Sequence, residues 1–276
     1  MSLYGLPVLF ALFVWWFSTG LIIFLDVLPK HTFRWSMLGA TAVLAAALYG
    51  LSLSGADTSV SGAYTAFTSG LLVWGWLEIS FFMGFVTGIR TESCAHGCRG
   101  WRHFGHAIQA CLYHEIAILL MAAAVFAITW NAPNQVGAWT FTVLWIMRLS
   151  SKLNVFLGVR NLNEQFLPES LAFLKSFLTQ KPMNALFPFS VTLATIAATV
   201  LVQRALAAPD AFAATGLTFV ATMLVLAIIE HWFLILPLPF AELWNWSLRG
   251  RASTWQGRLA FAAKRAPHPR VDECRT

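Results

Sequence analysis

Seven long apolar stretches divide this chain, and they constrain its fold more than any other feature of the sequence. A stretch of roughly 20 mostly apolar residues is long enough to cross the hydrocarbon core of a bilayer as a helix. We predict seven such spans, at about residues 5–28, 34–54, 62–88, 107–130, 135–158, 185–207 and 212–236. Turn residues separate them, for example Pro29-Lys30 and Pro209-Asp210. The expected fold is therefore an all-α, polytopic membrane helix bundle.

The composition supports a bilayer protein and argues against two other classes. Only 11% of the 276 residues are charged, whereas a soluble domain has about 25%. The net charge of +6 is concentrated in loops and in the C-terminal tail, where anionic lipid explains it. No basic surface interleaved with aromatic residues suggests a nucleic-acid partner. The lipid bilayer is thus the first expected partner.

The basic residues indicate the orientation of the bundle. If the N-terminus lies outside, 17 of the 18 Lys and Arg residues fall in cytoplasmic loops, at cytoplasmic span ends or in the tail, and only Arg204 falls outside. Cytoplasmic loops of membrane proteins carry an excess of Lys and Arg. We therefore predict an N-out, C-in topology, with a single transmembrane domain over residues 1–240 and a basic, Trp-containing cytoplasmic tail over residues 241–276.

Two further segments are expected on the membrane surface rather than across it. Residues 168–178 begin with Pro and Glu, which suit a helix N-terminus. They then place four apolar side chains on one face: Leu171, Leu174, Phe177 and Leu178. This pattern predicts an interfacial amphipathic helix. In the tail, Trp244, Trp246 and Trp255 alternate with basic residues, as in an interfacial anchor.

Seven ionisable residues within the predicted spans form the candidate functional site. Intramembrane ionisable groups are costly and usually face the bundle interior or a cavity. At a rise of 1.5 Å per residue, four spans bring these groups to a comparable height in the cytoplasmic half. Arg148 and Lys152 share a helix face and need carboxylates opposite. The seven residues are Glu78, His114, Glu115, Arg148, Lys152, Glu230 and His231.

Three interpretations of this cluster remain open from the residues alone. The first is a set of ion pairs that fixes helix packing. The second is a binding site, in which His114 and His231 with the three carboxylates hold a metal, or a pigment whose central metal takes an imidazole. The third is a proton or solute pathway. A microbial rhodopsin is excluded, because the last span has no lysine. A membrane di-iron enzyme would have Glu-x-x-His motifs, which the chain lacks.

A second group of soft ligands lies in the loop after the third span, in Cys94-Ala95-His96-Gly97-Cys98. Structural zinc usually has four ligands at paired spacings, and Cys111, His103 or His106 would have to complete the set. We expect a mobile loop here rather than a metal site. The four cysteines, which include Cys274, fall on or near the cytoplasmic side and are expected to be free thiols.

The segment KLNVFLGVRNLNEQFLPESLAFLKSF, residues 152–177, resembles the PuhE family of photosynthetic complex assembly proteins from phototrophic bacteria. Shorter stretches in the same order extend the resemblance over most of the chain. They are the Trp-rich first span, LEISFFMG at 77–84, YHE at 113–115 and IEHW at 229–232. The run from Arg160 to Pro168 is its most specific part, and the basic tail carries no resemblance.

The resemblance implies a multi-pass protein of the bacterial inner (intracytoplasmic) membrane that is needed for assembly of the reaction centre and light-harvesting complex. It also implies a link to the supply or handling of bacteriochlorophyll or a precursor, with reaction-centre or light-harvesting subunits and pigment-synthesis enzymes as partners. No catalytic residues carry over from the family, which favours an assembly factor over an enzyme. The alternatives are a membrane enzyme of tetrapyrrole metabolism that uses iron or zinc, and a transporter.

Overall fold

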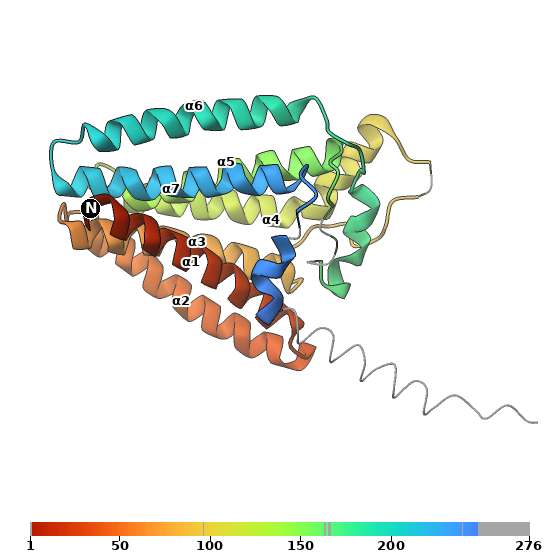
Figure 1. The fold of residues 1–276 in the computed structure, drawn as a ribbon. Helices are drawn as coiled ribbons and strands as arrows, with labels where there is room; N and C mark the ends of the chain where they lie inside the picture. Colours follow the sequence, from red (N-terminus) through yellow and green to blue (C-terminus); the bar gives the residue numbers. More distant parts are fainter. Residues whose placement is uncertain (1, 96, 163, 165–166, 239, 248–276) are drawn as a thin grey trace, which may run out of the picture.

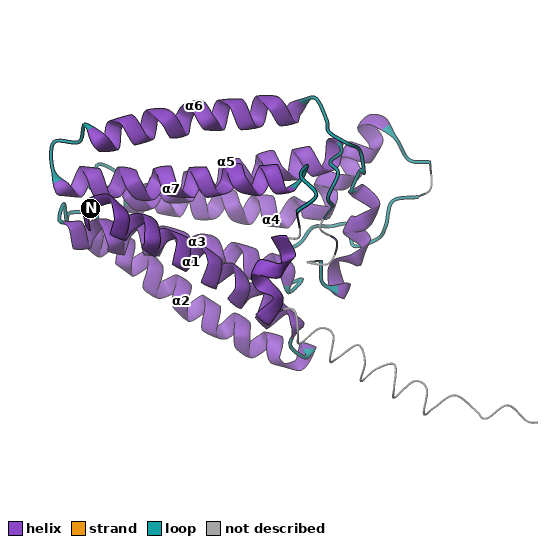
Figure 2. Cartoon of the chain, viewed as in Figure 1, coloured by secondary structure: helices purple, strands orange, loops and turns teal. Residues whose placement is uncertain are grey.

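Long helices make up most of this protein, for which a computed structural model describes residues 2–247 except 96, 163, 165–166 and 239. In these residues no strand occurs beyond an isolated bridge between Val159 and Gln180 (Figure 2). The all-α expectation is confirmed for them. The seven long helices are α1 (Ser2–Val27), α2 (Phe33–Ser54), α3 (Val60–Phe82), α4 (Gly100–Ile128), α5 (Val136–Leu157), α6 (Leu186–Leu206) and α7 (Ala211–Phe233). Short 3-10 helices are η1 (Lys30–Thr32), η3 (Glu169–Phe177) and η4 (Phe240–Trp244).

Five of the long helices are apolar and long enough to cross a membrane: α1, α2 (extended back to Lys30), α4, α6 and α7. The other two, α3 and α5, carry Glu78, Arg148 and Lys152 together with several Ser and Thr residues, which lower their hydropathy. Both lie against other helices of the bundle, α3 against α1, α2, α4, α5 and α7. Charged and polar side chains within a bundle usually face its interior. The composition of α3 and α5 therefore suits positions inside the bundle.

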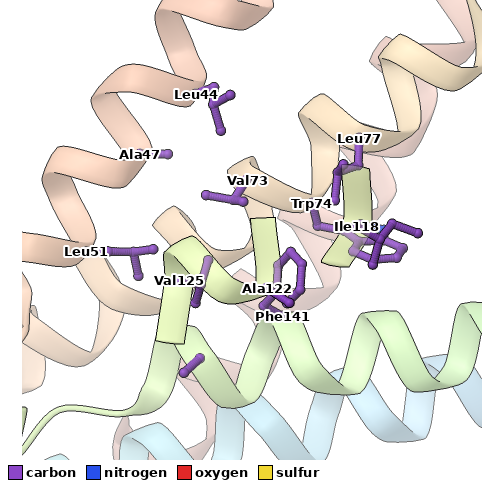
Figure 3. Close-up of a cluster of buried hydrophobic side chains, with 11 residues drawn as sticks. Leu44, Ala47, Leu51, Val73, Trp74, Leu77, Ile118, Ala122, Val125 and Phe141 are labelled. Carbon is purple, nitrogen blue, oxygen red and sulfur yellow. The ribbon is translucent and has the colours of Figure 1, made fainter. Parts of the chain in front are cut away.

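Two buried apolar clusters join most of the long helices, and a smaller one joins α6 to α5 and α7. The first joins α2, α3, α4 and α5, with Trp74 packing edge-on against Phe141 (Figure 3). The second joins α1, α3, α5 and α7, and in it the rings of Phe67 and Phe219 stack at 4.2 Å between centroids. Close approach of α3 and α5 depends on Gly70, because a Cβ there would come within 2.5 Å of the Gly137 carbonyl oxygen. Small residues at such crossings let helix backbones pack tightly.

The helices run alternately up and down, so their connections gather at two ends (Figure 1). Segments 28–32, 83–99 and 158–185 lie at one end, together with η4, and the N-terminus and segments 55–59, 129–135 and 207–210 lie at the other. We call the first the basic end, because every described Lys and Arg lies there or in the adjoining half of a helix, except Arg204 in the last turn of α6. The side of the membrane that this end faces stays a prediction.

The segment expected as an interfacial helix is the 3-10 helix η3. Its side chains Leu171, Leu174 and Phe177 are 0%, 9% and 5% exposed, and they pack against Phe81 of α3 and Ala110 of α4. The face that was expected to enter the membrane interface is therefore buried in protein. In consequence η3 covers the ends of α3 and α4 beside the ionisable residues.

The start of the tail also packs on protein. Trp244 meets Trp15 of α1 edge-on at 5.5 Å, and its indole N–H donates to the Trp16 carbonyl at 3.0 Å. Trp16 in turn donates from its own indole to the Leu243 carbonyl at 2.9 Å. The described part of the tail is thus attached to α1. Trp255 and the basic residues from Arg249 onward lie outside the described residues.

Candidate functional site

Helix α5 carries the two cations around which the site is built. Arg148 and Lys152, one helical turn apart, point to neighbouring helices on the same side of α5. Arg148 forms an ion pair with Glu78 of α3, with 2.8 Å between Nη2 and Oε2. Lys152 forms one with Glu115 of α4, with 2.7 Å between Nζ and Oε1. Two adjacent ion pairs therefore tie α5 to both α3 and α4.

The His114 side chain of α4 is completely buried beside these pairs. Its ring lies against that of Phe81, with 4.5 Å between centroids and 39° between planes. Neither ring nitrogen has a hydrogen-bond partner among the described residues. Buried polar groups in proteins nearly always have a partner, so this imidazole is an exception that calls for a reason.

Aromatic rings complete the surroundings of the two cations. Lys152 Nζ lies 5.6 Å from the centroid of Phe81, and Arg148 Cζ lies 5.7 Å from that of Phe82. Both distances allow cation–π attraction. The Phe81 ring is therefore shared between Lys152 and His114. We call Glu78, His114, Glu115, Arg148 and Lys152 the polar cluster.

The segment after α3 closes over the polar cluster. The Thr87 carbonyl accepts a hydrogen bond of 2.9 Å from the His114 backbone N–H. The following residue, Gly88, has no space for a Cβ, which would meet the carbonyl carbon of Ala110 at 2.5 Å. Glycine is thus required for the backbone to lie directly on α4. As a result, His114 is covered from the basic end.

The second histidine, His231 of α7, is not part of the polar cluster. Its Nδ1 lies 2.8 Å from the Ala227 carbonyl and its Nε2 lies 3.0 Å from Ser150 Oγ. Because a carbonyl only accepts, Nδ1 carries a proton and the ring is fully partnered. Residue 150 lies about 200° around α5 from residues 148 and 152, at 100° per residue. His114 and His231 therefore lie on different sides of α5.

Glu230 is also placed apart from the ion pairs. Its Oε1 accepts a hydrogen bond of 2.9 Å from the Trp15 indole, and its side chain is exposed on the outside of the bundle. Arg148 and Glu78 lie within electrostatic range of it. The described residues therefore show no group of ligand atoms close enough to share an ion among the five residues expected to bind a metal, which are Glu78, His114, Glu115, Glu230 and His231.

The residues that sequence reasoning missed are the uncharged partners. Phe81, Thr87 and Ser150 contact the predicted site residues but carry no charge that would single them out. Only Phe81 had a usable signal, because it lies three residues after Glu78 and so shares its helix face.

In the described part of the chain, the His, Cys, Asp and Glu side chains close enough to share an ion are Cys94, Cys98 and His106.

The loop thiols are free, as expected. Cys94, Cys98 and Cys111 form no disulfide, and Cys274 lies outside the described residues, as does His96. The hydrogen bond that Cys98 shares with Cys94 raises the pKa of the Cys98 thiol above its usual value, and burial adds to the effect.

Two comparisons relate the chain to known proteins. A family model described as "Protein of unknown function (DUF3623)" matches residues 1–255. The chain is 37% identical over 247 residues to a Rhodobacter capsulatus protein described as "Uncharacterized 30.4 kDa protein in puhA 5'region". That match covers 88% of this chain and 90% of the relative. No solved structure matches.

Proposed function

The chain belongs to the DUF3623 family, and we propose that it is an inner-membrane factor for assembly of the photosynthetic reaction centre and light-harvesting complex. In this proposal it handles bacteriochlorophyll or a precursor within the bilayer and is not itself an enzyme. Reaction-centre or light-harvesting subunits and pigment-synthesis enzymes are its partners.

Two independent observations support this role. The first is the described position of the Rhodobacter capsulatus relative, in the puhA 5' region, which agrees with the resemblance of residues 152–177 to the PuhE family. The second is the bundle itself, which has at least five helices suited to a membrane. The first supports a role near the photosynthetic apparatus, and the second supports a membrane protein.

The observation that carries the pigment part of the proposal is the unpartnered His114. The central metal of a chlorophyll-type pigment takes an imidazole nitrogen as an axial ligand, and His114 has both nitrogens uncommitted. His231 fits this task poorly, because both of its nitrogens are already hydrogen-bonded. Among the residues of the polar cluster, His114 would hold the pigment, and the Phe81 ring that packs against it would fix the position of the imidazole.

The enclosure of His114 adds a condition. Its side chain is 0% exposed, so a macrocycle reaches it only when the covering segment moves. That segment is held to α4 by two backbone hydrogen bonds among the described residues, from the His114 N–H to the Thr87 carbonyl and from the Arg90 N–H to the Gln109 carbonyl. We propose that pigment enters there, from the basic end.

The proposed topology follows from the concentration of Lys and Arg residues at the basic end. We propose that all seven long helices span the membrane, that the N-terminus lies outside and that the basic end faces the cytoplasm, as the positive-inside rule requires. Pigment and partner subunits would then meet the protein at the cytoplasmic leaflet.

A pigment-binding assay in a phototrophic host tests the proposal. Full-length protein is purified in mild detergent and its absorption spectrum is recorded. We expect wild-type protein to carry bacteriochlorophyll or a precursor, and His114→Leu to lose it at least tenfold. His231→Gln is the matched control and should keep it, because His231 Nε2 is committed to Ser150.

The same variants tested in the host separate this role from a purely structural one. His114→Leu should fail to restore the assembly of photosynthetic complexes in a strain that lacks the gene. If wild-type protein carried no pigment and the His114→Leu strain grew normally by phototrophy, the proposal would be refuted. The polar cluster would then serve only to fix helix packing through its ion pairs.

A further inference from the structure

The second candidate site lies outside the polar cluster, where the loop after α3 meets the first turns of α4. Cys94 and Cys98 lie on the loop, and His103 and His106 lie one turn apart on α4. The Cys94 and Cys98 sulfurs are 3.3 and 3.6 Å from His106 Nδ1. His103 Nδ1 lies 3.3 Å from Cys94 Sγ.

These separations are those expected of ligands that share one ion. Bond lengths of about 2.3 Å for zinc–sulfur and 2.1 Å for zinc–nitrogen at tetrahedral angles place sulfur and nitrogen roughly 3.6 Å apart. The ligand atoms of Cys94, Cys98 and His106 all lie within 4.8 Å of one another. Thiolate and imidazole are the ligands that zinc and similar ions prefer.

The Cys94 end of the loop is held in place by neighbouring structure. The Cys94 backbone N–H donates to Ser176 Oγ of η3 at 2.9 Å. The buried face of η3 fixes that helix against α3 and α4. The loop is thus anchored at its first ligand, and its mobility stays a prediction.

The surroundings of the site favour binding and leave one coordination position accessible. The ring of His103 lies between those of Phe156 and Phe177, at 5.4 and 5.3 Å between centroids. An open pocket of about 460 Å³ is lined by Cys94, Cys98 and His103. A fourth ligand can therefore approach from the pocket, either as water or by a small movement of His103.

We infer that Cys94, Cys98 and His106 bind one thiophilic divalent ion of the zinc class at the basic end of the bundle. The ion would join the loop to α4 and, through Ser176, to η3. It would act independently of the polar cluster and of any pigment at His114.

Metal analysis of the full-length protein tests this inference. Protein purified in detergent without chelator is expected to contain one zinc per chain. Cys94→Ser, Cys98→Ser and His106→Gln should each reduce the zinc content at least tenfold. Cys111→Ser is the matched control, because Cys111 is a free thiol on α4, the helix that carries His106, and is not one of the three proposed ligands. This variant should keep the zinc.

Cobalt substitution gives a second readout, and its first test uses wild-type protein alone. Wild-type protein stripped with a chelator should regain one equivalent of Co²⁺ and show sulfur-to-cobalt charge-transfer absorption, which zinc then displaces. Stripped wild-type protein that remains monodisperse but takes up neither ion would overturn the inference. The inference would also be overturned if Cys94 and Cys98 formed a disulfide and the reduced protein still took up no zinc. Cobalt absorption that is the same in Cys98→Ser as in wild-type protein would overturn it too.

Discussion

The two ion pairs of α5 have similar lengths but differ in burial, and this difference predicts unequal effects of mutation. Arg148→Met leaves the carboxylate of Glu78 without its partner, and that side chain is only 10% exposed. Lys152→Met leaves Glu115 alone, but its side chain is 31% exposed. Methionine keeps much of the apolar stem of either residue, so that loss of charge dominates the comparison.

The expected magnitudes follow from that burial. Removing one partner of a buried ion pair costs about 3–5 kcal/mol, and we take the lower end because 32% of the Arg148 side chain is exposed. The side chains of Lys152 and Glu115 are 24% and 31% exposed, so Glu115 is less enclosed than Glu78, and for this pair we take about 1 kcal/mol, the upper end for a surface pair. The difference of about 2 kcal/mol corresponds to roughly 4–8 °C in melting midpoint for a chain of this size.

The assay compares wild-type and variant proteins in one detergent at one salt concentration. Each sample is heated, and the monodisperse fraction that remains is measured by size-exclusion chromatography. The double variant Glu78→Gln with Arg148→Met should be more stable than the two single effects added together, because the pair is coupled by about 1–2 kcal/mol. A loss for Lys152→Met that equals the loss for Arg148→Met, or strict additivity in the double variant, would refute the reasoning.

Two further substitutions test the packing around the site and at the opposite end. Gly88→Ala should destabilise the protein by about 1–3 kcal/mol through overpacking against the Ala110 carbonyl. Gly75→Ala, where the added Cβ meets nothing within 4 Å, should be neutral or slightly stabilising in the same thermal assay. Asn134→Ala should cost about 1–3 kcal/mol, because the Asn134 amide lies 3.0 Å from each of three backbone carbonyls at the ends of α2 and α3. Normal melting of either destabilised variant would count against these contacts.

The positions of the long helices were predictable because an apolar stretch in a bilayer must satisfy its own backbone hydrogen bonds. The residues at which the helices begin and end were less predictable. The third span was expected to reach residue 88, but α3 ends at Phe82, and Gly84 then turns the chain with a φ of +82°. The fourth was expected to start at residue 107, but α4 begins at Gly100. Its first turns carry Arg102 and His103, which are compatible with a helix but not with an apolar pattern.

The pairing of the α5 cations with carboxylates was predictable, but the separation of His231 from these pairs was not. From the sequence we expected seven ionisable residues at a comparable height in the bundle. We also expected carboxylates opposite the two cations of α5, without knowing which carboxylate each would meet. The sequence did not reveal that Ser150 would face α7 and engage His231, because that depends on which helices adjoin α5. Nor did it reveal that Glu230 would bind Trp15, a residue 215 positions away in the chain.

That last bond has a consequence for the biosynthesis of the protein. Among the described helices, α7 is the last long one to leave the ribosome, yet it contacts α1, α3, α5 and α6. Until it is inserted, the earlier helices lack a neighbour, and Trp15 and Ser150 lack their hydrogen-bond partners on α7. Nascent chains truncated before α7 should therefore remain open in the bilayer and be targets for membrane proteases.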